Sequence, residues 1–143
     1  PKTYTSTVSS GERLQAAMEE LLIQHQVDLF ICGHVHSYER MYPVARNRRV
    51  ATDYVQPAAP VHIVTGHAGN TEGLSNRSPD SWDQPAPEWS AVRFGTDYGF
   101  SMMRFSQQDA GALPLALEWT MYGASTGQVH DRFTITKPLP RTA

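Results

Sequence analysis

Two histidines separated by one residue follow directly on an apolar run in the first third of the chain. The run Val27–Cys32 leads into Gly33-His34-Val35-His36. In an extended segment, residues i and i+2 point to the same side, with Cα atoms roughly 6–7 Å apart. Two imidazoles placed in this way can reach two metal ions about 3.5–4 Å apart, the separation found in binuclear hydrolytic sites. The spacing therefore predicts His34 and His36 as metal ligands. The alternative is a pair of hydrogen-bonded loop histidines.

The elements that must position these histidines can be predicted from hydrophobic periodicity. Residues 11–25 have the apolar spacing of an amphipathic helix, at Leu14, Ala17, Met18, Leu21 and Leu22. Residues 27–32 are apolar on both parities, which predicts a strand that is covered on both faces. A helix that runs straight into such a strand indicates an α/β fold, and open α/β sheets bind ligands beyond the carboxyl ends of their strands. Gly33 lets the backbone leave the strand with no Cβ in the way.

The rest of the chain is predicted to be mainly extended. Residues 38–44 are expected to be extended, with the strand interrupted at Pro43. Residues 46–49 are expected to form an Arg-rich solvated turn, and residues 61–65 a second buried strand. Residues 74–89 carry Pro, Asn, Ser and Asp and are expected to form a long loop. Three strands at 99–105, 113–122 and 129–136 form a meander with turns at 109–111 and 125–127. We expect one domain over residues 1–136 and a tail over 137–143.

Composition limits the class of protein. The chain has 143 residues, with 12 Lys and Arg against 14 Asp and Glu, for a formal charge of −2. This balance does not favour nucleic acid as a partner. The apolar runs are too short to span a membrane. The single cysteine, Cys32, excludes an internal disulfide framework and an all-cysteine metal site.

The segment around the two histidines resembles a known family. Residues 33–43, G-H-V-H-S-Y-E-R-M-Y-P, closely resemble the last metal-binding motif of purple acid phosphatases, in the calcineurin-like metallophosphoesterase superfamily. Other stretches resemble the same family in the same order along the chain, at 11–14, 27–29, 60–66, 69–74, 89–93, 98–100 and 131–135. The resemblance implies the C-terminal half of a metallophosphoesterase two-sheet sandwich that is flanked by helices.

The resemblance also implies an activity and a cofactor. Members of the purple acid phosphatase family are acid phosphatases that hydrolyse phosphate monoesters at a binuclear metal centre, in which Fe is paired with Zn, Mn or a second Fe. By motif position, His34 would bind the divalent ion and His36 the ferric ion. Two cations lower the pKa of a water molecule and neutralise the phosphate oxygens. Members of the family are secreted or vacuolar/lysosomal, and we expect the same of this protein.

The remaining ligand motifs of the family are not found in the sequence. The patterns D-x-G, G-D-x-x-Y, G-N-H-[DE] and V-x-x-H should precede G-H-x-H, but Asp109-Ala110-Gly111 follows it and is better explained as a turn. Pro1–Ser6 resembles the stretch after the family's fourth motif. We therefore expect the chain to be the C-terminal part of a catalytic domain, inactive alone, with the missing N-terminal half as its partner.

Three further residues leave alternatives open. His67 follows the second buried strand and is either a substrate contact or proton donor near the metals, or a solvent-exposed turn histidine. His62, within that strand, is expected to be a core or sheet-face histidine. Tyr38 either lines the pocket or packs under the metal-binding loop. For the whole protein, the alternatives are a phosphodiesterase or nucleotidase of the same superfamily, and a non-catalytic fragment or pseudoenzyme subunit that acts in assembly.

Overall fold

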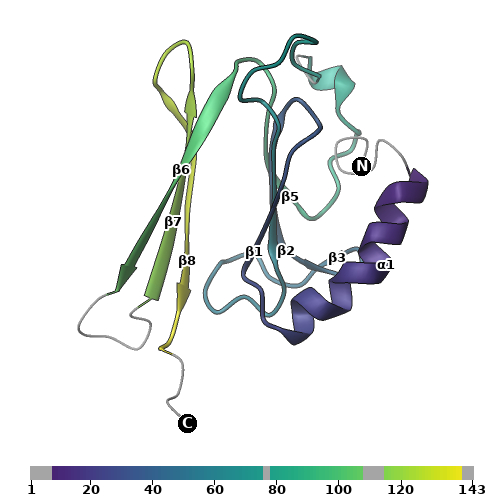
Figure 1. Ribbon diagram of the computed structural model, residues 1–143, viewed down its shortest axis with the longest axis vertical. Coiled ribbons are helices and arrows are strands. Elements are labelled where there is room, and N and C mark those ends of the chain that lie inside the picture. The colour runs from purple at the N-terminus through teal and green to yellow at the C-terminus, as the bar shows by residue number, and fades with distance from the viewer. Residues whose placement is uncertain (1–7, 76–77, 108–114, 140–143) are drawn as a thin grey trace.

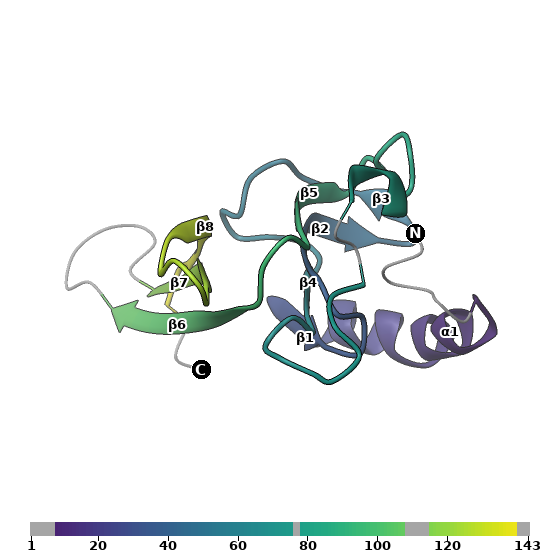
Figure 2. The ribbon, with the colours of Figure 1, turned by 90° about the horizontal axis from the view of Figure 1, so that it is seen from above.

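Two β-sheets and one α-helix make up the part of the chain that the computed structural model describes, residues 8–75, 78–107 and 115–139 (Figure 1). The helix α1 spans Val8–Gln24. It lies on the side of the first sheet that faces away from the second sheet (Figures 1 and 2). A short 3-10 helix, Pro79–Ser81, interrupts the long loop before the last strand of the first sheet.

The first sheet places two candidate site segments at the same end of its strands. Strand β1 (Leu29–Cys32) pairs in parallel with β4 (Val61–Thr65). The carboxyl ends of both strands therefore lie together. On the other side of β4 lies β2 (Tyr38–Ala45), antiparallel to it, and β2 also pairs with β5 (Ser90–Phe94) and with the two-residue β3 (Arg48–Arg49). The segments that follow β1 and β4 thus start from the same end of the sheet, beyond the carboxyl ends of these two strands.

The second sheet is an antiparallel meander packed against the first. Its strands are β6 (Gly99–Gln107), β7 (Leu115–Gly123) and β8 (Val129–Lys137), and β7 lies in the middle. Apolar side chains of both sheets meet in one cluster, because each sheet has an apolar face to bury. The cluster consists of Tyr38, Val61, Ile63, Trp119, Met121, Phe133 and Ile135.

The predicted α/β class is confirmed only in its coarser form. The described residues form mixed sheets with a single α-helix on one face, so the expected flanking by helices is not confirmed. The strands β7 and β8 are antiparallel and joined by a short turn, and such a connection needs no crossover helix. The apolar stripe of α1 remains largely in solvent at Leu14, Ala17, Met18 and Leu21. The predicted turn at 109–111 lies outside the described residues, and β8 extends through Lys137, the first residue of the predicted tail.

Two predictions about strands are wrong in detail, and one strand was missed. Strand β1 was expected to be covered on both faces, but it lies at an edge of the first sheet and Ile31 is 40% exposed. Strand β2 continues past Pro43 to Ala45, because the register shifts between Arg40 and Pro43 and the ladder needs no N–H donor from the proline. Strand β5 was not predicted at all. No helix among the described residues is both long and apolar enough to cross a membrane.

Candidate metal centre

The His34–His36 segment leaves β1 in tight turns. Val35 N–H donates to the Gly33 carbonyl at 2.9 Å, and Ser37 N–H donates to the Val35 carbonyl at 2.8 Å. His34 has a φ of 71°, in the left-handed region. The expectation of an extended segment is therefore wrong here, since a left-handed residue ends the strand path. Non-glycine residues in this region are uncommon, and they cluster at functional sites.

The turn at residues 72–75 holds His36 in one orientation. Its Nδ1 lies 3.0 Å from the Gly73 carbonyl oxygen and 3.8 Å from Oε2 of Glu72. The main chain of His36 is also fixed, because its carbonyl accepts from Ser75 N–H at 3.0 Å and its N–H donates to Ser75 Oγ at 3.3 Å. A carbonyl oxygen only accepts, so in the neutral imidazole Nδ1 is the nitrogen that carries the proton and Nε2 has the lone pair. Metal-binding histidines are commonly oriented in this way.

A glycine after β4 allows the second segment to approach the first. Gly66 N–H donates to the Ser37 carbonyl at 3.2 Å, and a Cβ at Gly66 would collide with the carbonyl oxygen of Val35. At Gly33, by contrast, a Cβ would meet no described atom within 4 Å. The lack of a Cβ, which the sequence analysis considered important at Gly33, is therefore required at Gly66 instead. The contact at Gly66 brings the His67 turn against the His34–His36 segment.

His67 is a core residue in this structure. It is 0% exposed, and its ring centroid lies 5.5 Å from that of Tyr38 and 6.4 Å from that of Phe94. Both ring nitrogens lack a hydrogen-bond partner among the described residues, and burial lowers its pKa. The alternative of a solvent-exposed turn histidine is therefore wrong. The role of His67 as a substrate contact or proton donor stays a prediction.

His62 and Tyr38 have structural positions. His62 is partly buried on the sheet face, with its ring 5.5 Å from that of Phe30, and burial lowers its pKa to about 4. This confirms the sheet-face interpretation. Tyr38 is 0% exposed and donates its hydroxyl to Oδ2 of Asp131 at 2.7 Å. Tyr38 is thus buried in the core between the two sheets, which favours the packing alternative over the lining of an open pocket.

The two histidines fit part of a metal site. Imidazole nitrogen suits both Fe and Zn, and the orientation of His36 leaves Nε2 free for a metal ion. Within the described ranges, however, no group of three or more His, Cys, Asp and Glu residues could hold a metal ion. His34 and His36 therefore supply at most a share of the ligands that a metal centre needs.

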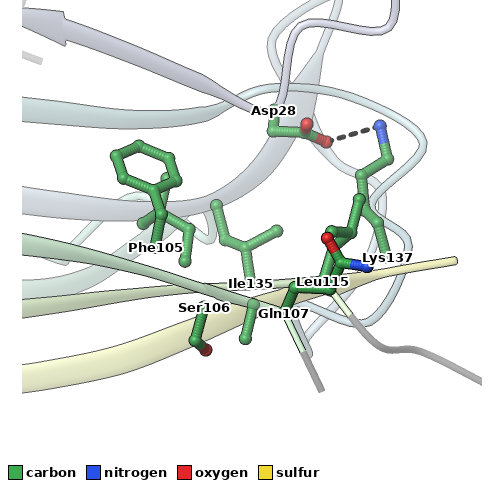
Figure 3. Close-up of a pocket in the computed structure, with 9 residues that line it drawn as sticks. Asp28, Phe105, Ser106, Gln107, Leu115, Ile135 and Lys137 are labelled. Carbon is green, nitrogen blue, oxygen red and sulfur yellow. Dashed lines mark ion pairs between the residues drawn. The ribbon is translucent and has the colours of Figure 1, made fainter. Parts of the chain in front are cut away.

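A pocket of about 430 Å³ lies beside Asp28, where strands β6 and β8 end and β7 begins (Figure 3). Apolar side chains such as Phe105, Leu117 and Ile135 line it, and the ion pair between Asp28 and Lys137, at 2.8 Å, lies beside them. Asp28 precedes β1, whereas His34 follows it. This pocket is therefore separate from the candidate metal centre.

Comparisons with known proteins give the family. Residues 59–132 match the family described as iron/zinc purple acid phosphatase-like protein C. Because this match covers more than half of the chain, the chain belongs to that family. The matched range begins after His34 and His36, so it does not bear on those two residues.

Individual relatives agree with the family assignment. Purple acid phosphatase 18 of Arabidopsis thaliana is 42% identical over 58% of this chain and 17% of its own length. An acid phosphatase of Aspergillus ficuum is 30% identical over 94% of this chain and 22% of its own length. The solved structure of a purple acid phosphatase from yellow lupin (Lupinus luteus) seeds matches with a TM-score of 0.65 and 27% identity, over 88% of this chain and 20% of that one. The chain thus spans about a fifth of the length of these relatives.

Proposed function

We propose that the chain is part of a binuclear-metal acid phosphatase that hydrolyses phosphate monoesters, with His34 and His36 among the metal ligands. The observation that supports this most directly is the orientation of His36, whose Nδ1 faces the Gly73 carbonyl and whose Nε2 is left for a metal ion. The names of the relatives support the same class of reaction. The remaining ligands would come from a part of the enzyme other than the described residues.

The proposed division of work follows the motif order. His34 would bind the divalent ion, Zn, Mn or a second Fe, and His36 the ferric ion. When bound, the metal pair supplies an activated water and neutralises the charge of the phosphate. The chain's own contribution is to fix the two imidazoles, through the turns at 33–37 and the hydrogen bonds between His36 and the turn at 72–75. His67 is a proposed substrate contact or proton donor that would need its buried ring to become accessible. By analogy with its family, we propose a secreted or vacuolar/lysosomal enzyme.

Substitution of the two histidines in the parent enzyme tests the proposal. His34→Ala and His36→Ala should each lower the bound metal and abolish hydrolysis of p-nitrophenyl phosphate, because each removes a ligand from the centre. His25→Ala is the matched control, since His25 is an exposed histidine directly after α1 and its loss should leave both quantities unchanged. Wild-type rates and metal content in His34→Ala and His36→Ala would refute the ligand role.

The same assays separate the two alternative functions. Hydrolysis of bis-p-nitrophenyl phosphate in preference to the monoester would identify a phosphodiesterase of the same superfamily. Hydrolysis of neither substrate by a parent protein with a full complement of metal would identify a non-catalytic subunit.

A further inference from the structure

A buried cluster of polar side chains joins the two sheets next to the candidate metal centre. Asp131, on β8, accepts from Arg40 on β2 through both carboxylate oxygens, at 2.7 Å from Nε and 2.9 Å from Nη2. It also accepts the Tyr38 hydroxyl at 2.7 Å. Asp131 lies 91 positions after Arg40 and 93 positions after Tyr38 in the chain. One carboxylate therefore fixes two side chains of β2.

Every polar side chain of this cluster has a partner. Arg40 is 8% exposed and Asp131 7%. The remaining Nη1 of Arg40 donates to the Tyr54 hydroxyl, and the guanidinium lies over the Phe133 ring at 4.8 Å from its centroid. The cluster is thus a fully paired network with a defined geometry.

The position of the cluster relates it to the metal-binding segment. Tyr38 is the first residue of β2 and the second residue after His36. Between them, Ser37 offers its carbonyl to Gly66 N–H. The bonds from Asp131 therefore hold the strand at the point where the His34–His36 segment enters it. A buried ion pair adds little net stability over apolar packing of the same volume, whereas its directional bonds define orientation.

We propose that Asp131 is a positioning residue: through Tyr38 and Arg40 it fixes the start of β2 and thereby the placement of the His34 and His36 imidazoles. The consequence for metal binding and catalysis rests on the function proposed above. The consequence for the orientation of the imidazoles is independent of that function, because it concerns only the chain's own contacts.

Two variants weaken the cluster to different extents. Tyr38→Phe removes one hydrogen bond and keeps the ring in the core. Asp131→Asn removes the charge that pairs with Arg40 and is the more disruptive change. The matched control is Lys137→Met, which breaks the Asp28–Lys137 ion pair between the same two layers at their opposite end.

The first measurement does not depend on metal or activity. In the metal-free parent enzyme labelled with ¹⁵N at its histidine rings, the resonances of His34 and His36 are assigned by their loss in the alanine variants. We expect both cluster variants to shift or broaden these resonances well below the unfolding temperature, and Lys137→Met to leave them in place. A purely stabilising cluster would lower the unfolding temperature without this change.

The second measurement uses the metal-loaded parent enzyme. The affinity for the divalent ion should fall by about tenfold in the cluster variants, the lower end of the effect of substituting partners that orient metal ligands. The kcat value should fall with little change in KM. If both variants fold and the ring resonances and metal affinity match the wild type, the proposal is overturned; if Asp131→Asn does not fold, Tyr38→Phe decides. Failure of the proposed function would instead be seen as full metal content in His34→Ala and His36→Ala, with the ring measurement unaffected.

Discussion

His34 combines a proposed chemical role with an unfavourable backbone conformation. Its φ of 71° places an L-residue where Cβ crowds the following carbonyl, which costs about 1 kcal/mol or more. Glycine does not have this penalty. We therefore expect His34→Gly to be more stable to urea unfolding than His34→Ala, by about 1 kcal/mol.

The control for this comparison is an exposed loop residue with ordinary dihedral angles. Ala58→Gly should destabilise the chain, because glycine has more freedom to lose on folding and no left-handed strain is relieved there. Equal stability of the glycine and alanine variants at position 34 would contradict the strain argument.

His62 makes the stability of the chain depend on pH. Burial lowers its pKa from 6.5 to about 4, so between these pH values the unfolded chain binds a proton that the folded chain excludes. The contribution of His62 is therefore complete above about pH 6.5 and is lost progressively as the pH falls to about 4. A shift of this size corresponds to about 3 kcal/mol. The pKa of His67 is lowered for the same reason, so it acts in the same direction.

Urea unfolding between pH 7 and pH 4, a range that spans the shift of His62, measures this effect. His62→Gln should flatten the decline in unfolding free energy, because glutamine does not titrate. His25→Gln, at an exposed position, should leave the slope as in the wild type. A decline of the same steepness in His62→Gln and in the wild type would show that His62 is not its source.

At the scale of elements, apolar periodicity and turn residues predicted the helix and most of the strands. The apolar run at 61–65 gave the bounds of β4 correctly, and the predicted helix over 11–25 overlaps α1 (Val8–Gln24) with an error at its start. The three meander strands were also predicted, because alternation and turn residues are local signals. The order of the strands within the first sheet was not predicted.

The elements that sequence reasoning missed depend on contacts between distant residues. Strand β5 follows a proline-rich loop and is attached to β2 by Glu39, which accepts from Ser90 Oγ at 2.6 Å and from Arg93 Nε at 3.1 Å. These partners lie 51 and 54 positions away from Glu39. The clamp on His36 by Gly73 and the cluster around Asp131 have the same origin. The types of the candidate ligands were thus readable from the sequence, but their orientation was not.

At the scale of the whole molecule, the described chain has two candidate metal ligands and no group of three or more. A binuclear centre needs about four ligands for each ion, and water competes for every vacant position. A 143-residue chain that offers two imidazoles is therefore expected to bind metal weakly and not to turn over p-nitrophenyl phosphate.

Elemental analysis after dialysis, together with a phosphatase assay, tests this expectation on the chain by itself. We expect less than one equivalent of Fe, Zn or Mn and no activity above the buffer rate. The His34→Ala/His36→Ala double variant is the matched control and should retain only the metal that binds elsewhere. Two equivalents of metal in the wild-type chain, lost in the double variant, would contradict the expectation. That result would mean that the ligands of the centre are supplied within these 143 residues, and the share of the site assigned to the rest of the parent enzyme would have to be reassigned to this chain.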